Sequence, residues 1–144
     1  MIAPEEIKIP TPGVVRKAET PIEGSCVLLA EDDPALRRYL EVVLQRSGYR
    51  VVGAADGLEA MKFLLTSTVD IVVTDAMMPN LSGYELCRFI RGSKHLSHLP
   101  VVLLSALDPK NSASEAEQAD VFLSKPVSPE QLVECLTALV AEAR

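Results

Sequence analysis

The chain has 144 residues, a length that suits one domain with one substantial hydrophobic core. Hydrophobic residues make up 48% and charged residues 24%, as in an ordinary soluble globular protein. The formal net charge of −6 argues against direct nucleic-acid binding by this chain. No apolar run approaches the roughly 20 residues that cross a bilayer, and the first residues lack the pattern of a signal peptide. We therefore expect a cytoplasmic protein with no membrane partner.

Residues 1–24 differ in composition from the rest of the chain. Acidic residues and lysines are interspersed there with the helix-breaking residues Pro4, Pro10, Pro12 and Pro21. Within this stretch, residues 7–9 could form a short edge strand. We expect an N-terminal arm or linker over residues 1–24 and a single folded domain over residues 25–144.

From residue 25 onward, short apolar runs alternate with stretches of helical periodicity. The apolar runs predict strands at 27–30, 50–54, 71–73, 101–104 and 121–123. Apolar residues three or four apart predict helices at 34–47, 57–65, 82–91 and 128–143, with a weaker candidate at 112–118. Asp33 is a suitable N-cap for the first helix, because Pro34 follows it at the first helical position.

The predicted strands are continuous apolar runs rather than alternating ones. Such strands are buried on both faces, as in a parallel sheet covered by helices. Five βα units with right-handed crossovers predict a doubly wound α/β fold, in which ligands bind at the carboxyl ends of the strands. The candidate site therefore consists of the polar residues that follow the strands, namely Glu31, Asp32, Asp75, Ser105 and Lys125.

A cluster of carboxylates at one sheet edge needs a cation or a proton. Two carboxylates about 5 Å apart repel each other by roughly 3 kcal/mol at an effective dielectric constant of 20. Oxygen ligands that leave open coordination positions suit Mg²⁺. A carboxylate beside Mg²⁺ and an ammonium group is poised to attack a phosphoryl group, because both cations neutralise charge on the phosphoryl oxygens. The pattern thus points to phosphoryl transfer.

Four segments contain these candidate residues: Ala30-Glu31-Asp32-Asp33-Pro34, the run from Asp75 to Gly83, Ser105-Ala106 and Lys125-Pro126. Together they resemble the receiver domain of two-component response regulators, and the similarity extends over about residues 25–143. The resemblance implies a flavodoxin-like sheet with strand order 2-1-3-4-5. It also implies a histidine kinase or a His-phosphotransfer protein as phosphoryl donor, and a downstream protein target.

The resemblance also assigns roles around the phosphoryl group. Asp75 resembles the phospho-acceptor and a metal ligand. Asp32 resembles the direct Mg²⁺ ligand, Glu31 the acid that acts through a bound water, and Met77 the residue whose backbone carbonyl contacts the metal. Lys125 would pair first with the acceptor carboxylate and then with the phosphoryl group.

Two further residues match the positions through which this family signals. Ser105 resembles the switch hydroxyl. Phe122 matches the aromatic switch position, although an aromatic residue on a strand is as readily plain core. In the family the bond before the proline at position 126 is usually cis, which would direct Lys125 into the site.

Other classes of protein also use an aspartate at the end of a strand or share the receiver fold. A haloacid-dehalogenase-type hydrolase would have a second aspartate where Met77 stands, and the chain has no cap domain. A pseudo-receiver that binds partners without phosphorylation stays open as the alternative. Cys26, Cys87 and Cys135 are expected to be buried, reduced thiols. His95 and His98 are expected in a solvated loop rather than at a metal site.

The chain departs from the family in two places. Between Ser105 and Lys125 it is about two residues shorter than usual and has Glu117-Gln118-Ala119-Asp120 where a helix-ending glycine is common. The output face is therefore expected to differ. Met77 and Leu107 stand where polar side chains could position an attacking water, which predicts a slow loss of the phosphoryl group.

Overall fold

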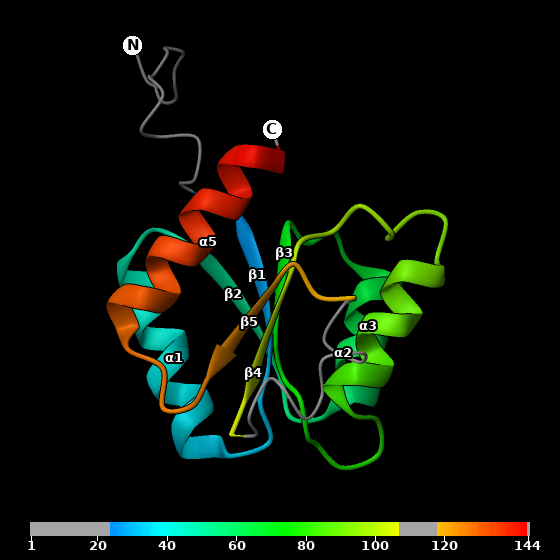
Figure 1. The fold of residues 1–144 in the computed structure, drawn as a ribbon, viewed down its shortest axis with the longest axis horizontal. Helices are drawn as coiled ribbons and strands as arrows, with labels where there is room; N and C mark the ends of the chain where they lie inside the picture. Colours follow the sequence, from blue (N-terminus) through cyan, green and yellow to red (C-terminus); the bar gives the residue numbers. More distant parts are fainter. Residues whose placement is uncertain (1–23, 107–117, 144) are drawn as a thin grey trace, which may run out of the picture.

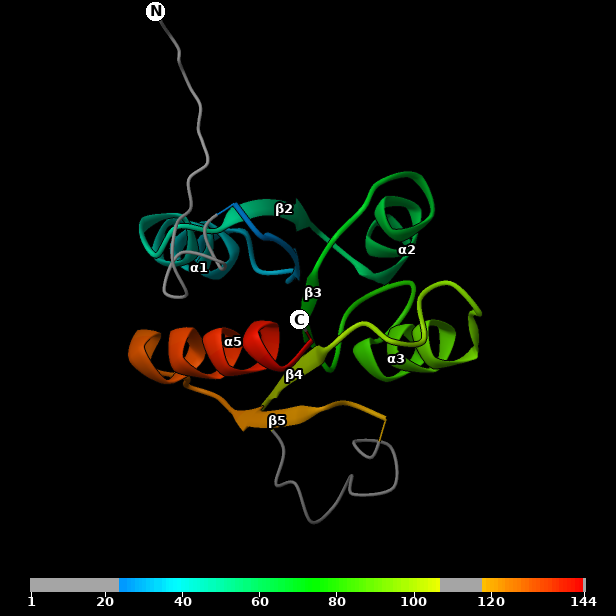
Figure 2. The same cartoon turned by 90° about the horizontal axis from the view of Figure 1, so that it is seen from above.

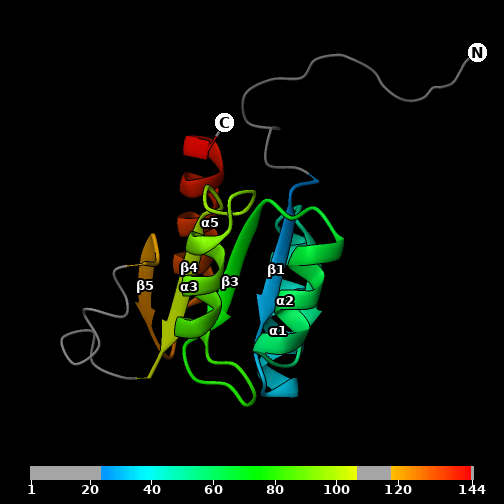
Figure 3. The ribbon, with the colours of Figure 1, turned by 90° about the vertical axis from the view of Figure 1, so that its right-hand side faces the viewer.

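The computed structural model describes residues 24–106 and 118–143. Its five strands are β1 (Cys26–Ala30), β2 (Arg50–Ala54), β3 (Ile71–Asp75), β4 (Val101–Ser105) and β5 (Val121–Ser124). They form one parallel sheet in the order β2-β1-β3-β4-β5. The predicted strand order is confirmed. The strands run side by side with their carboxyl ends at the lower edge of Figure 3.

Four helices pack on the sheet: α1 (Pro34–Arg46), α2 (Gly57–Thr66), α3 (Gly83–Gly92) and α5 (Pro129–Ala143). Figure 1 and Figure 2 show α1 and α5 on one face of the sheet and α2 and α3 on the other. None of the helices in the described part of the chain has the length and apolar character to cross a membrane. The expected arm at 1–24 lies almost entirely outside the described residues. So do Leu107 and nearly all of the weaker helix candidate at 112–118.

The helices begin where side chains satisfy their free N–H groups. Asp33 Oδ1 accepts from the N–H groups of Ala35 and Leu36, as the sequence predicted. Ser82 and Glu85 form a reciprocal capping box at the start of α3. The predicted helices at 82–91 and 128–143 each begin one residue early. They include Ser82 and Ser128, whose hydroxyl groups accept from N–H groups of the first turn, because a cap shares the polar character of that turn.

Two strand ends differ from the prediction. Asp75 and Ser105 were expected to follow their strands, but each is the last residue of its strand. The ladder continues through both residues, since Asp75 pairs with Leu104 and Ser105 pairs with Ser124. A polar side chain on the last residue of a strand therefore does not stop backbone pairing there.

Alternate residues of each strand enter two separate hydrophobic cores. Cys26, Leu28 and Ala30 of β1 face α2 and α3, whereas Val27 and Leu29 face α1 and α5. All five β1 residues are buried. This two-sided burial explains why the strands read as continuous apolar runs.

The three cysteines are free. Cys26 and Cys87 are buried, as expected, while Cys135 is only half-buried. His95 and His98 are exposed in the segment between α3 and β4.

Candidate metal and phosphoryl site

The register of the two central strands sets the position of the site. Ala30 of β1 pairs with Thr74 of β3, so the next residues along the two strands are Glu31 and Asp75. Asp32 follows Glu31 directly. The two neighbouring strands thus bring three carboxylates to the same end of the sheet, as the sequence predicted.

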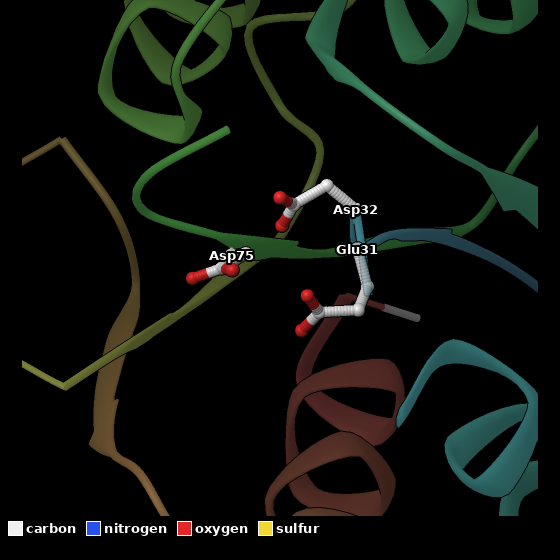
Figure 4. A group of neighbouring side chains, drawn as sticks. All are labelled: Glu31, Asp32 and Asp75. Carbon is white, nitrogen blue, oxygen red and sulfur yellow. The ribbon is translucent and has the colours of Figure 1, made fainter. Parts of the chain in front are cut away.

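The carboxyl groups of Glu31, Asp32 and Asp75 offer ligand oxygens that all lie within 4.8 Å of one another. Figure 4 shows the carboxyl groups of Glu31 and Asp32 extending towards the side on which Asp75 lies. Glu31 and Asp75 are buried, whereas Asp32 is exposed. No hydrogen bond or ion pair of the Asp32 carboxylate is found among the described residues. The cluster therefore has two enclosed acids and one open to the surface.

Lys125 joins the acids from the end of β5. Its Nζ lies 3.0 Å from Asp75 Oδ2 and 3.1 Å from Glu31 Oε1. The Lys125-Pro126 peptide is cis, as the resemblance implies. Burial lowers the pKa of Lys125, but the hydrogen bonds to Asp75 and Glu31 outweigh it and raise the pKa above its usual value. Lys125 therefore carries a positive charge at neutral pH.

Glu31 is held from several directions. Its backbone N–H donates to the Ala54 carbonyl at 3.0 Å, and its Oε2 accepts from the Asp33 N–H at 3.1 Å. Burial raises the pKa of Glu31, and the neighbouring charge of Asp75 raises it further, while hydrogen bonds from Asp33 and Lys125 act in the opposite sense. A cation among these acids would favour the charged form of the Glu31 carboxylate.

The remaining predicted residues lie around this cluster. Ser105 is buried at the end of β4, and its carbonyl accepts from the Lys125 N–H at 2.8 Å. Met77 lies two residues beyond Asp75 with its side chain largely exposed. Phe122 is half-buried and packs against the core on the α2 and α3 face.

Three contacts around the site were not foreseen. Arg37 Nη1 donates to the Glu31 carbonyl at 2.7 Å. Asn80 Nδ2 donates to Asp56 Oδ2 at 2.8 Å and ties the loop after β3 to the start of α2. A Cβ on Gly83 would lie 2.0 Å from the Asp75 carbonyl oxygen, so glycine is required for this close approach. Two of them carry a sequence signal, namely the glycine at a helix start and the arginine one turn into the helix after an acidic pair.

The donor set fits a hard divalent cation. All three side chains offer carboxylate oxygen, and the exposed Asp32 leaves one side of the cluster open for water or phosphate oxygens. Mg²⁺ prefers this combination of few carboxylates and several exchangeable ligands. Thiolate or imidazole ligands, which softer metals favour, are absent from this cluster.

Comparison with known families decides the classification. The model of the response regulator receiver domain family matches residues 27–137. The chain belongs to this family. The observed sheet order and the helices on both of its faces are those of the flavodoxin-like fold of receiver domains.

Individual relatives agree with this classification. Over 128 residues the receiver domain is 32% identical to the transcriptional regulatory protein GltR of Pseudomonas aeruginosa, covering 84% of this chain and 51% of GltR. The chain spans about half the length of the curated relatives it matches, or less.

Solved structures show the same domain. The receiver domain of a histidine kinase from Syntrophus aciditrophicus has a TM-score of 0.78 at 32% identity, covering 83% of this chain and 92% of that chain. The response regulator TrrA of Thermotoga maritima, solved in complex with Mg²⁺ and BeF, has a TM-score of 0.73 at 30% identity. That match covers 80% of this chain and 98% of TrrA.

Proposed function

We propose that this receiver domain accepts a phosphoryl group on Asp75, in a Mg²⁺-dependent reaction, from the phosphohistidine of a histidine kinase or a His-phosphotransfer protein. The observation that carries the proposal is the position of Lys125 Nζ, 3.0 Å from Asp75 Oδ2 beside three clustered carboxylates. We place this exchange in the cytoplasm, where the three free thiols would stay reduced.

In the transfer step, a carboxylate oxygen of Asp75 attacks phosphorus. The new O–P bond forms as the P–N bond of the phosphohistidine breaks, and the imidazole leaves with the electron pair of that bond. Lys125 holds Asp75 Oδ2 in place before the attack and then offers its ammonium group to a phosphoryl oxygen. The buried position of Asp75 keeps bulk water from competing for the phosphoryl group.

Asp32, Glu31 and Asp75, with the backbone carbonyl of Met77, would hold the metal. Mg²⁺ bound there supplies positive charge next to the phosphoryl oxygens. The similarity to TrrA, which was solved with Mg²⁺ and BeF, supports this assignment. Glu31 has the least accessible carboxylate and is best suited to act through a bound water.

Ser105 would then respond to the new charge. An aspartyl phosphate carries about −1.5 to −2 charges and offers strong acceptors. The Ser105 hydroxyl, at the end of β4, would donate to it and draw its loop inwards, and the half-buried Phe122 could fill the vacated space. This changes the surface presented to a downstream protein.

The central experiment is incubation with acetyl phosphate and Mg²⁺, read by intact mass. The parent should gain one phosphoryl group, and Asp75→Asn or omission of Mg²⁺ should abolish the gain. Asp33→Asn is the matched control, because Asp33 caps α1 and asparagine caps equally well. A parent that stays unmodified while folded would favour the alternative, a pseudo-receiver that binds partners without phosphorylation.

A second experiment tests the switch. Ser105→Ala should still be phosphorylated on Asp75, but its amide NMR spectrum should change less than the parent spectrum does. A spectrum that changes as fully as the parent's would remove Ser105 from the switch.

A further inference from the structure

Asp32 is the exposed acid of the metal cluster, and its own carboxylate has no partner among the described residues that would hold it. The direction in which this side chain leaves the chain is set by the backbone. The two peptide groups that flank Asp32 are planar, so fixing both of them fixes the φ and ψ of Asp32 and the direction of its Cα–Cβ bond. The structure shows a hydrogen bond on each plane.

The plane after Asp32 contains the Asp33 N–H group. This group donates to Glu31 Oε2 at 3.1 Å. Because Glu31 Oε1 also accepts from Lys125 at 3.1 Å, the acceptor itself is held in place. The Asp33 side chain further ties this segment to the first turn of α1.

The plane before Asp32 contains the Glu31 carbonyl. Pairing between β1 and β2 ends with the Glu31 N–H donating to the Ala54 carbonyl, because β2 ends there and Asp56 caps α2. A strand-end carbonyl in this position needs another donor. Arg37, half-buried on the first turns of α1, supplies it through Nη1 at 2.7 Å.

Gly53 of β2 lies beneath the side chains of α1, close to Glu41 and in ordinary van der Waals range of Arg37. A Cβ there would lie 2.2 Å from Glu41 Oε2 and 3.5 Å from Arg37 Cδ. The absence of a side chain at Gly53 thus leaves room for the Glu41 side chain to lie across the strand, beside the stem of Arg37.

We propose that Arg37 is a positioning residue of the metal site: its bond to the Glu31 carbonyl fixes the peptide before Asp32 and so aims the Asp32 carboxylate at the metal. This inference rests on the proposed function. Groups that orient metal ligands typically change metal affinity about 10–100-fold when removed. Arg37 acts through the backbone and touches neither the metal nor the phosphoryl group.

The test is direct Mg²⁺ titration of the full chain, followed by the amide NMR shifts of the site and without any phosphoryl donor. Arg37→Gln should bind Mg²⁺ about 10-fold more weakly than the parent. Arg38→Gln is the matched control, because it removes the same charge from a side chain that is 73% exposed and pairs only loosely with Glu41. Its affinity should stay within about twofold of the parent.

The direction of the change in Mg²⁺ affinity distinguishes a positioning role of Arg37 from a purely electrostatic one. Removing a positive charge near a divalent cation strengthens binding by itself, so a purely electrostatic role predicts tighter Mg²⁺ binding in Arg37→Gln. Arg37→Lys keeps a charged donor on a long stem and should recover most of the affinity. A lysine variant as weak as the glutamine variant would overturn the positioning role, as would parent-like affinity in Arg37→Gln.

A substitute variant and the Mg²⁺ affinity of the parent keep the outcome clear. If Arg37→Gln fails to fold, Arg37→Met keeps the apolar stem and takes its place with the same expected loss. If the parent itself binds no Mg²⁺, the proposed function fails. If the parent binds and the Arg37 variants bind equally well, only the positioning role fails.

Discussion

Asn80 Nδ2 donates a 2.8 Å hydrogen bond to Asp56 Oδ2, so the loop between β3 and α3 is tied to the start of α2. Asn80 has a φ of 71°, in the left-handed region. The adjoining contact is close as well, because a Cβ on Gly57 would lie 2.1 Å from the Leu81 carbonyl oxygen. The loop that carries Met77 is thereby held against α2.

Substitutions at Asn80 should separate the hydrogen bond from the backbone conformation. Asn80→Gly keeps the left-handed conformation and removes the bond, which should lower the free energy of unfolding by about 0.5–1.5 kcal/mol, with a small further loss from the greater freedom of glycine in the unfolded chain. Asn80→Ala also places an alanine at positive φ, which should cost a further ~1 kcal/mol. Urea denaturation measures both values. A larger loss for glycine than for alanine would contradict this account.

Gly83 should be intolerant of any side chain. The Cβ of Gly83→Ala would lie 2.0 Å from the Asp75 carbonyl oxygen, a backbone atom that cannot move away alone. We expect a loss of about 1–3 kcal/mol in stability and slower phosphorylation, because the shift would displace Asp75. Gly92→Ala, with nothing within 4 Å of the added Cβ, is the control. It should be neutral or stabilising, since alanine favours the helix.

The two buried tyrosines should respond in opposite directions to loss of their hydroxyl groups. Within the described chain, the Tyr84 hydroxyl is buried without a hydrogen-bond partner. Tyr84→Phe should therefore raise the free energy of unfolding by about 1 kcal/mol, because it removes an unsatisfied polar group. The Tyr49 hydroxyl lies 3.3 Å from Thr137 Oγ1, so Tyr49→Phe should lower stability. Destabilisation by Tyr84→Phe of the same size would show that its hydroxyl has a partner.

Local patterns explain what the sequence could predict. Buried parallel strands read as apolar runs, and the polar residue that closes each run lies at the carboxyl edge, so Glu31 and Asp75 could be placed together. Asp33 could be read as a cap because capping depends on its immediate neighbours. The classification and the strand order came from several such motifs acting together.

Contacts between distant segments could not be predicted in this way. Arg91 donates to the carbonyls of Ser97, Leu99 and Gln118 and pairs with Asp120 at 2.7 Å. It thereby joins α3 to the beginnings of β4 and β5. An arginine on a helix surface carries no sign of such partners, because they are chosen by tertiary packing. The contact between Asn80 and Asp56, which are 24 residues apart in the sequence, is of the same kind.

Alkaline pH should weaken the fold through Cys87. Burial raises the pKa of this thiol to about 11, from a usual value of 9.0. Below pH 9 the thiol is protonated in both states and its contribution is complete. Between pH 9 and 11 the unfolded chain releases the proton first, so up to about 2–3 kcal/mol of stability is lost. Urea unfolding of the parent and of Cys87→Ala at pH 8 and pH 10.5 isolates the contribution of the Cys87 thiol to the free energy of unfolding.

The stability advantage of the parent over Cys87→Ala should shrink as the pH rises. Other groups titrate in the same range, but they are common to both proteins and cancel in the difference. An advantage that stays constant across this range would mean that the Cys87 pKa is not raised.

The last prediction concerns the lifetime of the phosphorylated state. Hydrolysis of an acyl phosphate needs a water held in line behind phosphorus. The side chains two residues after Asp75 and two after Ser105 are Met77 and Leu107, and neither can orient a water through a strong hydrogen bond. Met77 is 59% exposed, so it lies where a polar replacement would meet solvent. Lost orientation slows a reaction by a factor on the order of 10–100, and we therefore expect slow hydrolysis.

Replacing both residues should speed the loss of the phosphoryl group. The variant Met77→Asn with Leu107→Glu adds an amide and a carboxylate, two groups that can hydrogen-bond an attacking water. The lifetime is measured by intact mass after removal of acetyl phosphate, with Met77→Leu as the control that changes shape without adding a polar group. Equal lifetimes in the parent and the double variant would refute the idea. A parent lifetime of only seconds would do the same, because water would then reach phosphorus without help from either position.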